Sequence, residues 1–137
     1  MTVIKRLSVL ILVSYMGVVF MLSTVPDAGA THTLFAIVPN VIQKLGHLLA
    51  FGLLALLWIV TLRVHGAPER LSVCVALVVA SGYGAVTELF QVGVPGRFPS
   101  MWDFMIDVSG ILLFIWCYWV RWMHLLERLL HPQRPDA

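Results

Sequence analysis

Residues 45–62, LGHLLAFGLLALLWIVTL, form an apolar stretch with one ionisable side chain, His47, near its start. An α-helix needs about 20 mostly apolar residues to cross the hydrocarbon core of a bilayer. Three further stretches have the same character, at residues 7–25, 71–90 and 104–120. None shows the two-residue alternation of a strand, and backbone groups in lipid must be hydrogen-bonded within their own segment. The sequence therefore predicts an all-α integral membrane bundle of four transmembrane helices.

The composition agrees with a bilayer as the solvent. The chain is 60% hydrophobic and 12% charged over 137 residues, whereas a soluble domain is nearer half apolar and a quarter charged. This length suits a single domain, residues 1–137. No basic run points to nucleic acid as a partner. Cys74 and Cys117 lie in apolar stretches without metal-ligand spacing, so we expect both to be small buried hydrophobic residues.

The two ends of the chain need separate interpretation. Lys5 and Arg6 precede the first apolar stretch, and residues 28–30, Ala-Gly-Ala, resemble the cleavage site of a signal peptide. The apolar stretch is longer than the core of a usual signal peptide, so we expect it to be retained as a transmembrane helix. Residues 124–137 are expected to form a short cytoplasmic tail that contains an amphipathic surface helix.

The distribution of basic residues predicts the orientation. Of the nine Lys and Arg residues, seven lie near the N-terminus, in or directly before the loop 64–70, or in the C-terminal part, and only Lys44 and Arg97 lie in the other two loops. Positive residues accumulate on the cytoplasmic side of membrane proteins. Both termini and the loop 64–70 should therefore be cytoplasmic. The loops 26–44 and 91–103 should face outward.

In this topology, polar residues gather at one membrane depth, at the outer ends of the second, third and fourth helices. Lys44 and His47 are spaced i,i+3, and so are Glu88 and Gln91. Asp103 and Asp107 are spaced i,i+4, so the members of each pair share a helix face. Ser100 or Asp103 can cap the fourth helix, and Gly110 would allow another helix to approach closely. Gly82 and Gly84 could serve the third helix in the same way. The candidate site residues are Lys44, His47, Glu88, Gln91, Arg97, Ser100, Asp103 and Asp107.

These residues also resemble the pattern of a known family. The elements of that pattern, in chain order, are Lys44-x-x-His47, Glu88-x-x-Gln91, Pro95-Gly96-Arg97-x-x-Ser100-x-x-Asp103 and Gly110. Together they resemble the VanZ-like family over about residues 40–115. The resemblance implies a small bacterial protein of the inner or plasma membrane, in a family whose founding member is associated with teicoplanin resistance. The family usually has Asn where this chain has Asp107, which adds a negative charge here.

Two interpretations of the polar cluster remain open. Lys44, Arg97, Glu88, Asp103 and Asp107 nearly cancel in charge and would make a structural network, with Arg97 coupled to Glu88. Ionisable residues within spans also commonly mark a functional site. A metal ion bound by His47, Glu88 and Asp107 has no recognised motif, such as HExxH, to support it. The sequence therefore predicts no metal and no cofactor, and it assigns no catalytic residue.

Three classes of function follow. The preferred one is a protein that binds an envelope lipid, a lipid-linked precursor or a glycopeptide at the outer leaflet, with membrane lipids as its partners and a link to glycopeptide resistance. Arg97 would contact a phosphate or carboxylate. The second is a membrane enzyme with His47 or Glu88 as its acid–base group, although no nucleophile motif accompanies them. The third is a lipid transporter or flippase, which the lack of a polar path in the cytoplasmic half disfavours. The oligomeric state is left open.

Overall fold

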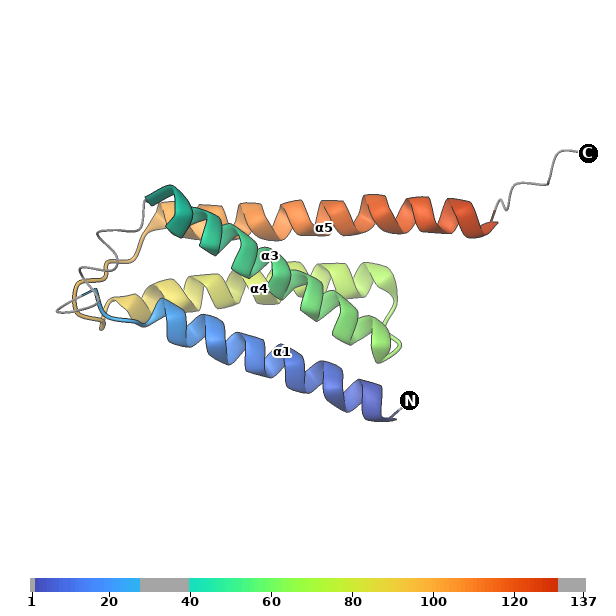
Figure 1. The fold of residues 1–137 in the computed structure, drawn as a ribbon, viewed down its shortest axis with the longest axis horizontal. Coiled ribbons are helices and arrows are strands. Elements are labelled where there is room, and N and C mark those ends of the chain that lie inside the picture. The colour runs from blue at the N-terminus through green and yellow to red at the C-terminus, as the bar shows by residue number, and fades with distance from the viewer. Residues whose placement is uncertain (1, 28–39, 131–137) are drawn as a thin grey trace, which may run out of the picture.

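The computed structural model describes residues 2–27 and 40–130, and within these ranges it has four helices and no strand. In chain order the helices are α1 (Thr2–Ser23), α3 (Asn40–Val64), α4 (Glu69–Gln91) and α5 (Met101–Leu130). They run up and down side by side, so that the N-terminus and the far end of α5 lie at the same end of the bundle (Figure 1). This confirms the all-α architecture. The cytoplasmic assignment of that end remains a prediction.

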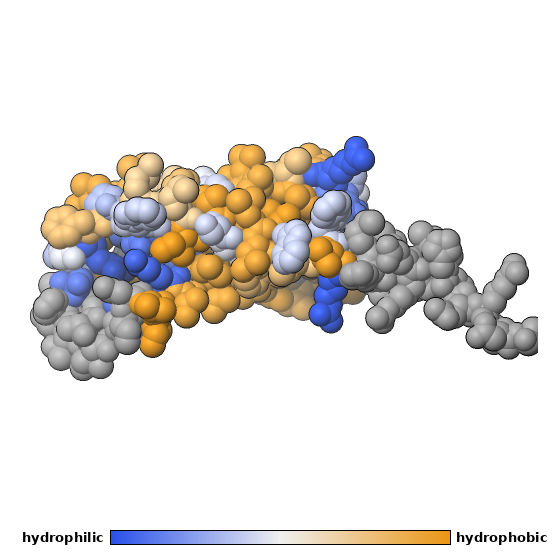
Figure 2. Space-filling view, turned by 90° about the horizontal axis from the view of Figure 1, so that it is seen from above, coloured by the Kyte–Doolittle hydropathy of each residue, from blue (hydrophilic) through white to orange (hydrophobic). Residues whose placement is uncertain are grey.

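Each helix is long and apolar enough to cross a membrane, which makes the chain a multi-pass membrane protein. Many large hydrophobic side chains point away from the bundle, including Val78, Leu89 and Trp116, as expected where lipid replaces water. One face shows a broad apolar band between two polar ends (Figure 2). Cys74 and Cys117 belong to this outer surface, because both are exposed free thiols. The prediction that they are buried was wrong, since an apolar segment in lipid does not distinguish its packed face by hydrophobicity.

The core is formed mainly where α3 packs against its neighbours, with Phe51, Leu54 and Ile111 almost completely buried. Gly110 brings α5 against α3, because a Cβ there would overlap the backbone carbonyl of Leu48. The predicted close approach at Gly110 is thereby confirmed. Small residues in a membrane helix permit this kind of backbone contact.

The buried face of α4 is made of small and polar residues at a spacing close to one helical turn: Ser72, Ala76, Ala80, Gly84, Thr87, Glu88 and Gln91. Gly84 lies close to Phe51 and Asp107, as predicted for a glycine at a helix contact, whereas Gly82 has open space around it and plays no such part. Along this face the small residues are therefore followed by the larger polar residues Glu88 and Gln91, at the C-terminal end of α4.

The first helix packs against α3 and α4, through Leu12 and Val19 in the core and through two tyrosine hydroxyls. Tyr15 donates to the carbonyl of Ala50 on α3 at 3.0 Å, and Tyr83 on α4 donates to the carbonyl of Met16 at 2.6 Å. At the other end of the chain, α5 continues past residue 120 to Leu130, which makes the first part of the predicted tail an extension of this helix. Residues 131–137 of that tail, and residues 28–30, which resemble a cleavage site, lie outside the described residues.

Candidate functional site

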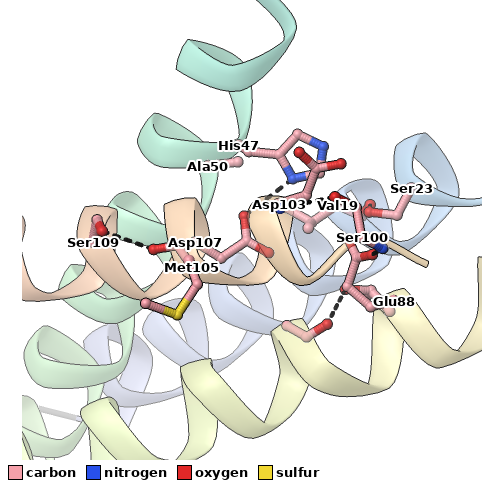
Figure 3. A network of polar contacts seen from close by, with 12 residues as sticks. Val19, Ser23, His47, Ala50, Glu88, Ser100, Asp103, Met105, Asp107 and Ser109 are labelled. Carbon is pink, nitrogen blue, oxygen red and sulfur yellow. Dashed lines mark hydrogen bonds and ion pairs between the residues drawn. The ribbon is translucent and has the colours of Figure 1, made fainter.

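A group of polar side chains meets at the end of the bundle opposite the N-terminus, where α3 and α5 begin and α4 ends (Figures 1 and 3). His47 comes from α3, Glu88 from α4 and Asp107 from α5, so three helices contribute to one site. Asp107 and Glu88 are buried, with 0% and 6% of their surfaces exposed. His47 is partly exposed. His47, Glu88 and Asp107, which the sequence places at one membrane depth, therefore lie in one site although they come from three different helices.

The best-defined contact in the site is between His47 and Asp107. His47 Nδ1 lies 3.0 Å from Asp107 Oδ1 (Figure 3). Leu48, next to His47, touches Gly110, one turn after Asp107, so the close approach of the two helices holds this pair together. The second oxygen of Asp107, Oδ2, is buried and has no hydrogen-bond partner among the described residues.

Glu88 is oriented by the start of α5. Its Oε2 accepts a hydrogen bond from the backbone N–H of Ser100 at 2.7 Å. The hydroxyl of Ser100 in turn accepts from the N–H of Asp103 at 3.2 Å, which is the geometry of a residue that caps a helix N-terminus. The prediction that Ser100 can cap this helix is confirmed. The other carboxylate oxygen of Glu88, Oε1, is buried without a hydrogen-bond partner within the described part of the chain.

Arg97 is positioned by a tight turn. Arg97 donates its backbone N–H to Val94 at 3.1 Å, and Pro95 and Gly96 form the middle of the turn, with Gly96 at φ +76°. Pro followed by a glycine of positive φ is typical of a type II turn. The turn also contacts the end of α1, because Asp27 donates its N–H to the carbonyl of Pro95 at 3.1 Å.

Beside the buried carboxylates there is a cavity of about 230 Å³ between α1, α3 and the turn. Its polar lining includes Arg97, Gln43 and His47, and its apolar lining comes from residues such as Val19 and Phe51. Sequence reasoning assigned no site residue to α1, because an apolar helix gives no signal of which face borders a cavity. Gln43 directly precedes Lys44, and this position is the one feature of the sequence that could have marked it as a site residue.

The remaining candidate residues lie around this centre. Asp103 is half-buried and, like Glu88, lies close enough to interact electrostatically with His47 (Figure 3). Gln91 is buried on α4, whereas Lys44 is exposed. In residues 41–121, neither Lys44 nor Arg97 forms an ion pair with Glu88 or Asp107. The electrostatic coupling expected between Arg97 and Glu88 remains a prediction; Glu88 accepts a hydrogen bond from the backbone N–H of Ser100 instead of forming an ion pair with Arg97.

The chemistry of the arrangement is that of a carboxylate-rich centre next to an imidazole. His47 and Asp107 form a hydrogen-bonded pair that can hold or move a proton at the cavity wall. Donor atoms of His47, Glu88 and Asp107 also lie within 4.8 Å of one another, which brings them into the range of a shared cation.

Comparison with known proteins agrees with the pattern of motifs. No curated protein and no solved structure matches the chain. A family model described as VanZ/LLP1 matches residues 7–124, so the match includes α1 as well as the three helices that carry the site. The match covers most of the 137 residues. The chain therefore belongs to the VanZ/LLP1 family.

Proposed function

We propose that this membrane protein binds the polar headgroup of an envelope amphiphile, either a lipid or a lipid-linked precursor, at the outer leaflet. The observation that carries the proposal is the cavity beside His47 and Arg97. One part of its lining is polar, and the rest comes from apolar residues of α1 and α3 such as Leu22 and Ala50. An amphiphile has the same division between a polar headgroup and apolar chains.

The size of the cavity limits the ligand. Its volume of about 230 Å³ lies just below the range of roughly 300–1,000 Å³ that is usual for small-molecule sites. A phosphate-bearing headgroup fits such a space, while a whole glycopeptide does not. A role in glycopeptide resistance would therefore act through the lipid or the lipid-linked precursor rather than by enclosing the antibiotic.

Charge supports an anionic headgroup. Arg97 is half-buried in the cavity wall, and its planar guanidinium can bind two oxygens of a phosphate or carboxylate at once. Lys44 is exposed on the same end of α3 and would add positive potential near that surface. The outward orientation of this end follows from the distribution of basic residues and is part of the proposal.

The cavity can be tested with a pair of matched variants. Gly46 lines the cavity and has open space where a side chain would begin, so Gly46→Leu should fill it without displacing the backbone. Gly82 also has open space around it but lies away from the cavity, so Gly82→Leu is the control for the same chemical change. Native mass spectrometry of the purified protein should show co-purified lipid in the wild type and in Gly82→Leu. Gly46→Leu should lose it.

A second pair tests the contact with the anion. Arg97→Lys keeps the positive charge but loses the planar fork, whereas Arg97→Met loses both. Retained lipid and teicoplanin susceptibility of an expressing strain should both change in Arg97→Lys, although the protein still folds. If a folded Arg97→Lys protein and Gly46→Leu both match the wild type, the headgroup site is refuted.

One observation favours a second candidate, a membrane enzyme that acts on an envelope lipid or glycan. The hydrogen bond between His47 Nδ1 and Asp107 Oδ1 orients an imidazole at the cavity wall, as an acid–base residue requires. Incubation of the protein with labelled envelope lipids would reveal turnover. The enzyme hypothesis predicts that a new product forms with the wild type and does not form with His47→Gln. A protein that only binds the lipid leaves it chemically unchanged.

A further inference from the structure

The His47–Glu88–Asp107 group brings one donor atom from each of three helices within 4.8 Å of the others. We propose that these three residues bind a single divalent transition-metal ion, such as Mn²⁺ or Zn²⁺. No metal motif is visible in the sequence, because the ligands are separated by 41 and 19 positions (47 to 88, and 88 to 107) and meet only in the folded bundle. The proposal does not depend on the identity of an amphiphile in the cavity.

Two carboxylate oxygens point to a cation. Asp107 Oδ2 and Glu88 Oε1 are both buried and have no hydrogen-bond partner among the described residues, although their side chains are more than nine-tenths buried. A buried carboxylate without a partner is strongly disfavoured. In residues 41–121, no Lys or Arg forms an ion pair with either carboxylate. A divalent ion would balance the two negative charges and supply a partner for both oxygens.

The distances suit coordination. Ligands about 2.1 Å from one ion are about 3.0 Å apart at a right angle and about 4.2 Å apart when opposite. The separation of 3.0 Å between His47 Nδ1 and Asp107 Oδ1 is therefore that of two adjacent ligands, and coordination by both carboxylate oxygens of Asp107 would occupy Oδ2 as well. The hydrogen bond between His47 and Asp107 is then lost, because a nitrogen must be unprotonated to bind an ion. The widest separation in the group, 4.8 Å at most, needs a closure of only about half an ångström, which a glutamate side chain can provide.

Neighbouring groups already hold the ligands. Ser100 donates its backbone N–H to Oε2 of Glu88, which leaves Oε1 for the ion. The absence of a side chain at Gly84 leaves room beside Asp107, since a Cβ there would be 3.4 Å from Oδ2. Ligands that are hydrogen-bonded or packed in this way bind metals more tightly than free ones.

The donor set defines the class of metal. One imidazole nitrogen with two carboxylates suits Mn²⁺, Fe²⁺ and Zn²⁺. Mg²⁺ usually keeps several waters and uses one or two carboxylates, which fits a buried three-helix site less well. His47 lines the cavity, so an ion bound to it would have one side directed toward that space. A metal site with an open position can bind an oxygen of a ligand.

The experiment uses the full chain, free of any tag, purified in detergent and stripped with a chelator. Titration calorimetry with MnCl₂ and with ZnCl₂, together with elemental analysis, should give one ion per chain. Glu88→Gln and Asp107→Asn keep the size of each side chain but remove its charge, so each should weaken binding by at least about 100-fold. The matched controls Glu69→Gln and His65→Gln remove the same groups at the opposite end of the bundle and should bind like the wild type.

A stability measurement guards against misfolded variants. Without metal, Glu88→Gln and Asp107→Asn should melt at or above the temperature of the wild type, because an uncompensated buried charge has been removed. Added Mn²⁺ should raise the melting temperature of the wild type and leave these two variants unchanged. The proposal is overturned if the stripped wild type binds neither ion, or if binding persists in both variants, as it would through the exposed thiols of Cys74 and Cys117.

Discussion

Gly110→Ala is the most direct test of how the site is held together. A Cβ at this position would overlap the carbonyl carbon, oxygen and Cα of Leu48, all of them backbone atoms that cannot rotate away. Overpacking of this kind costs about 1–3 kcal/mol, and a backbone obstacle favours the upper part of that range. Alanine regains about 1 kcal/mol over glycine in a helix. The net loss in free energy of unfolding should therefore be about 1–2 kcal/mol.

Gly82→Ala is the control, because Gly82 has nothing within contact distance and should show only the helical gain of about 1 kcal/mol. The two variants should therefore differ by about 2–3 kcal/mol. The assay is reversible unfolding in mixed micelles, followed by tryptophan fluorescence. Separation of α3 from α5 would also lengthen the 3.0 Å contact between His47 and Asp107, so affinity for Mn²⁺ should fall in Gly110→Ala alone. A Gly110→Ala protein as stable as Gly82→Ala would refute this account of the helix contact.

Three further outcomes are expected. Ser100→Ala removes the helix cap and should lower stability by about 0.5–2 kcal/mol in thermal melts followed by circular dichroism; it should leave Mn²⁺ affinity nearly unchanged, because Glu88 accepts from the backbone of residue 100. Gly96→Ala places a side chain at φ +76° against the carbonyl of Asp27, so it should detach the turn from α1. Native mass spectrometry should then show reduced lipid retention, and full retention would contradict the docking of the turn. A fluorescent protein fused after Ala137 should be bright and an alkaline phosphatase fusion inactive, whereas the reverse would overturn the predicted topology.

Within the described residues, the sequence was sufficient for the number and order of the membrane-spanning helices, because each apolar run is as long as a bilayer is thick. The helix ends were less well predicted. The sequence predicts a fourth helix that starts at residue 104, yet α5 begins at Met101 and continues to Leu130. Counting apolar residues finds only the part of a helix that lies in hydrocarbon. A helix that extends beyond it keeps its backbone hydrogen bonds, which composition does not reveal.

The site was predictable in depth but not in detail. His47 and Lys44 are one turn apart at the same end of α3, yet His47 meets Asp107 and Lys44 is exposed. A single sequence does not determine how each helix is rotated about its own axis, and rotation decides which of two neighbouring polar residues faces inward. The cavity was harder still to predict from the sequence. Helix α1 contributes to it through Val19 and Leu22, which look like any other residues of an apolar helix.

The length of α5 has a mechanical consequence. Its 30 residues make a rod about 45 Å long, against a hydrocarbon core of about 30 Å. One end of this rod carries Asp107 and the Ser100 cap, and the other extends past the remaining helices (Figure 1). A tilt of about 5° about the end that holds the site would move the far end by about 4 Å. Such a tilt would make α5 a lever: a displacement too small to break a hydrogen bond at one membrane surface would become one the size of a side chain at the other.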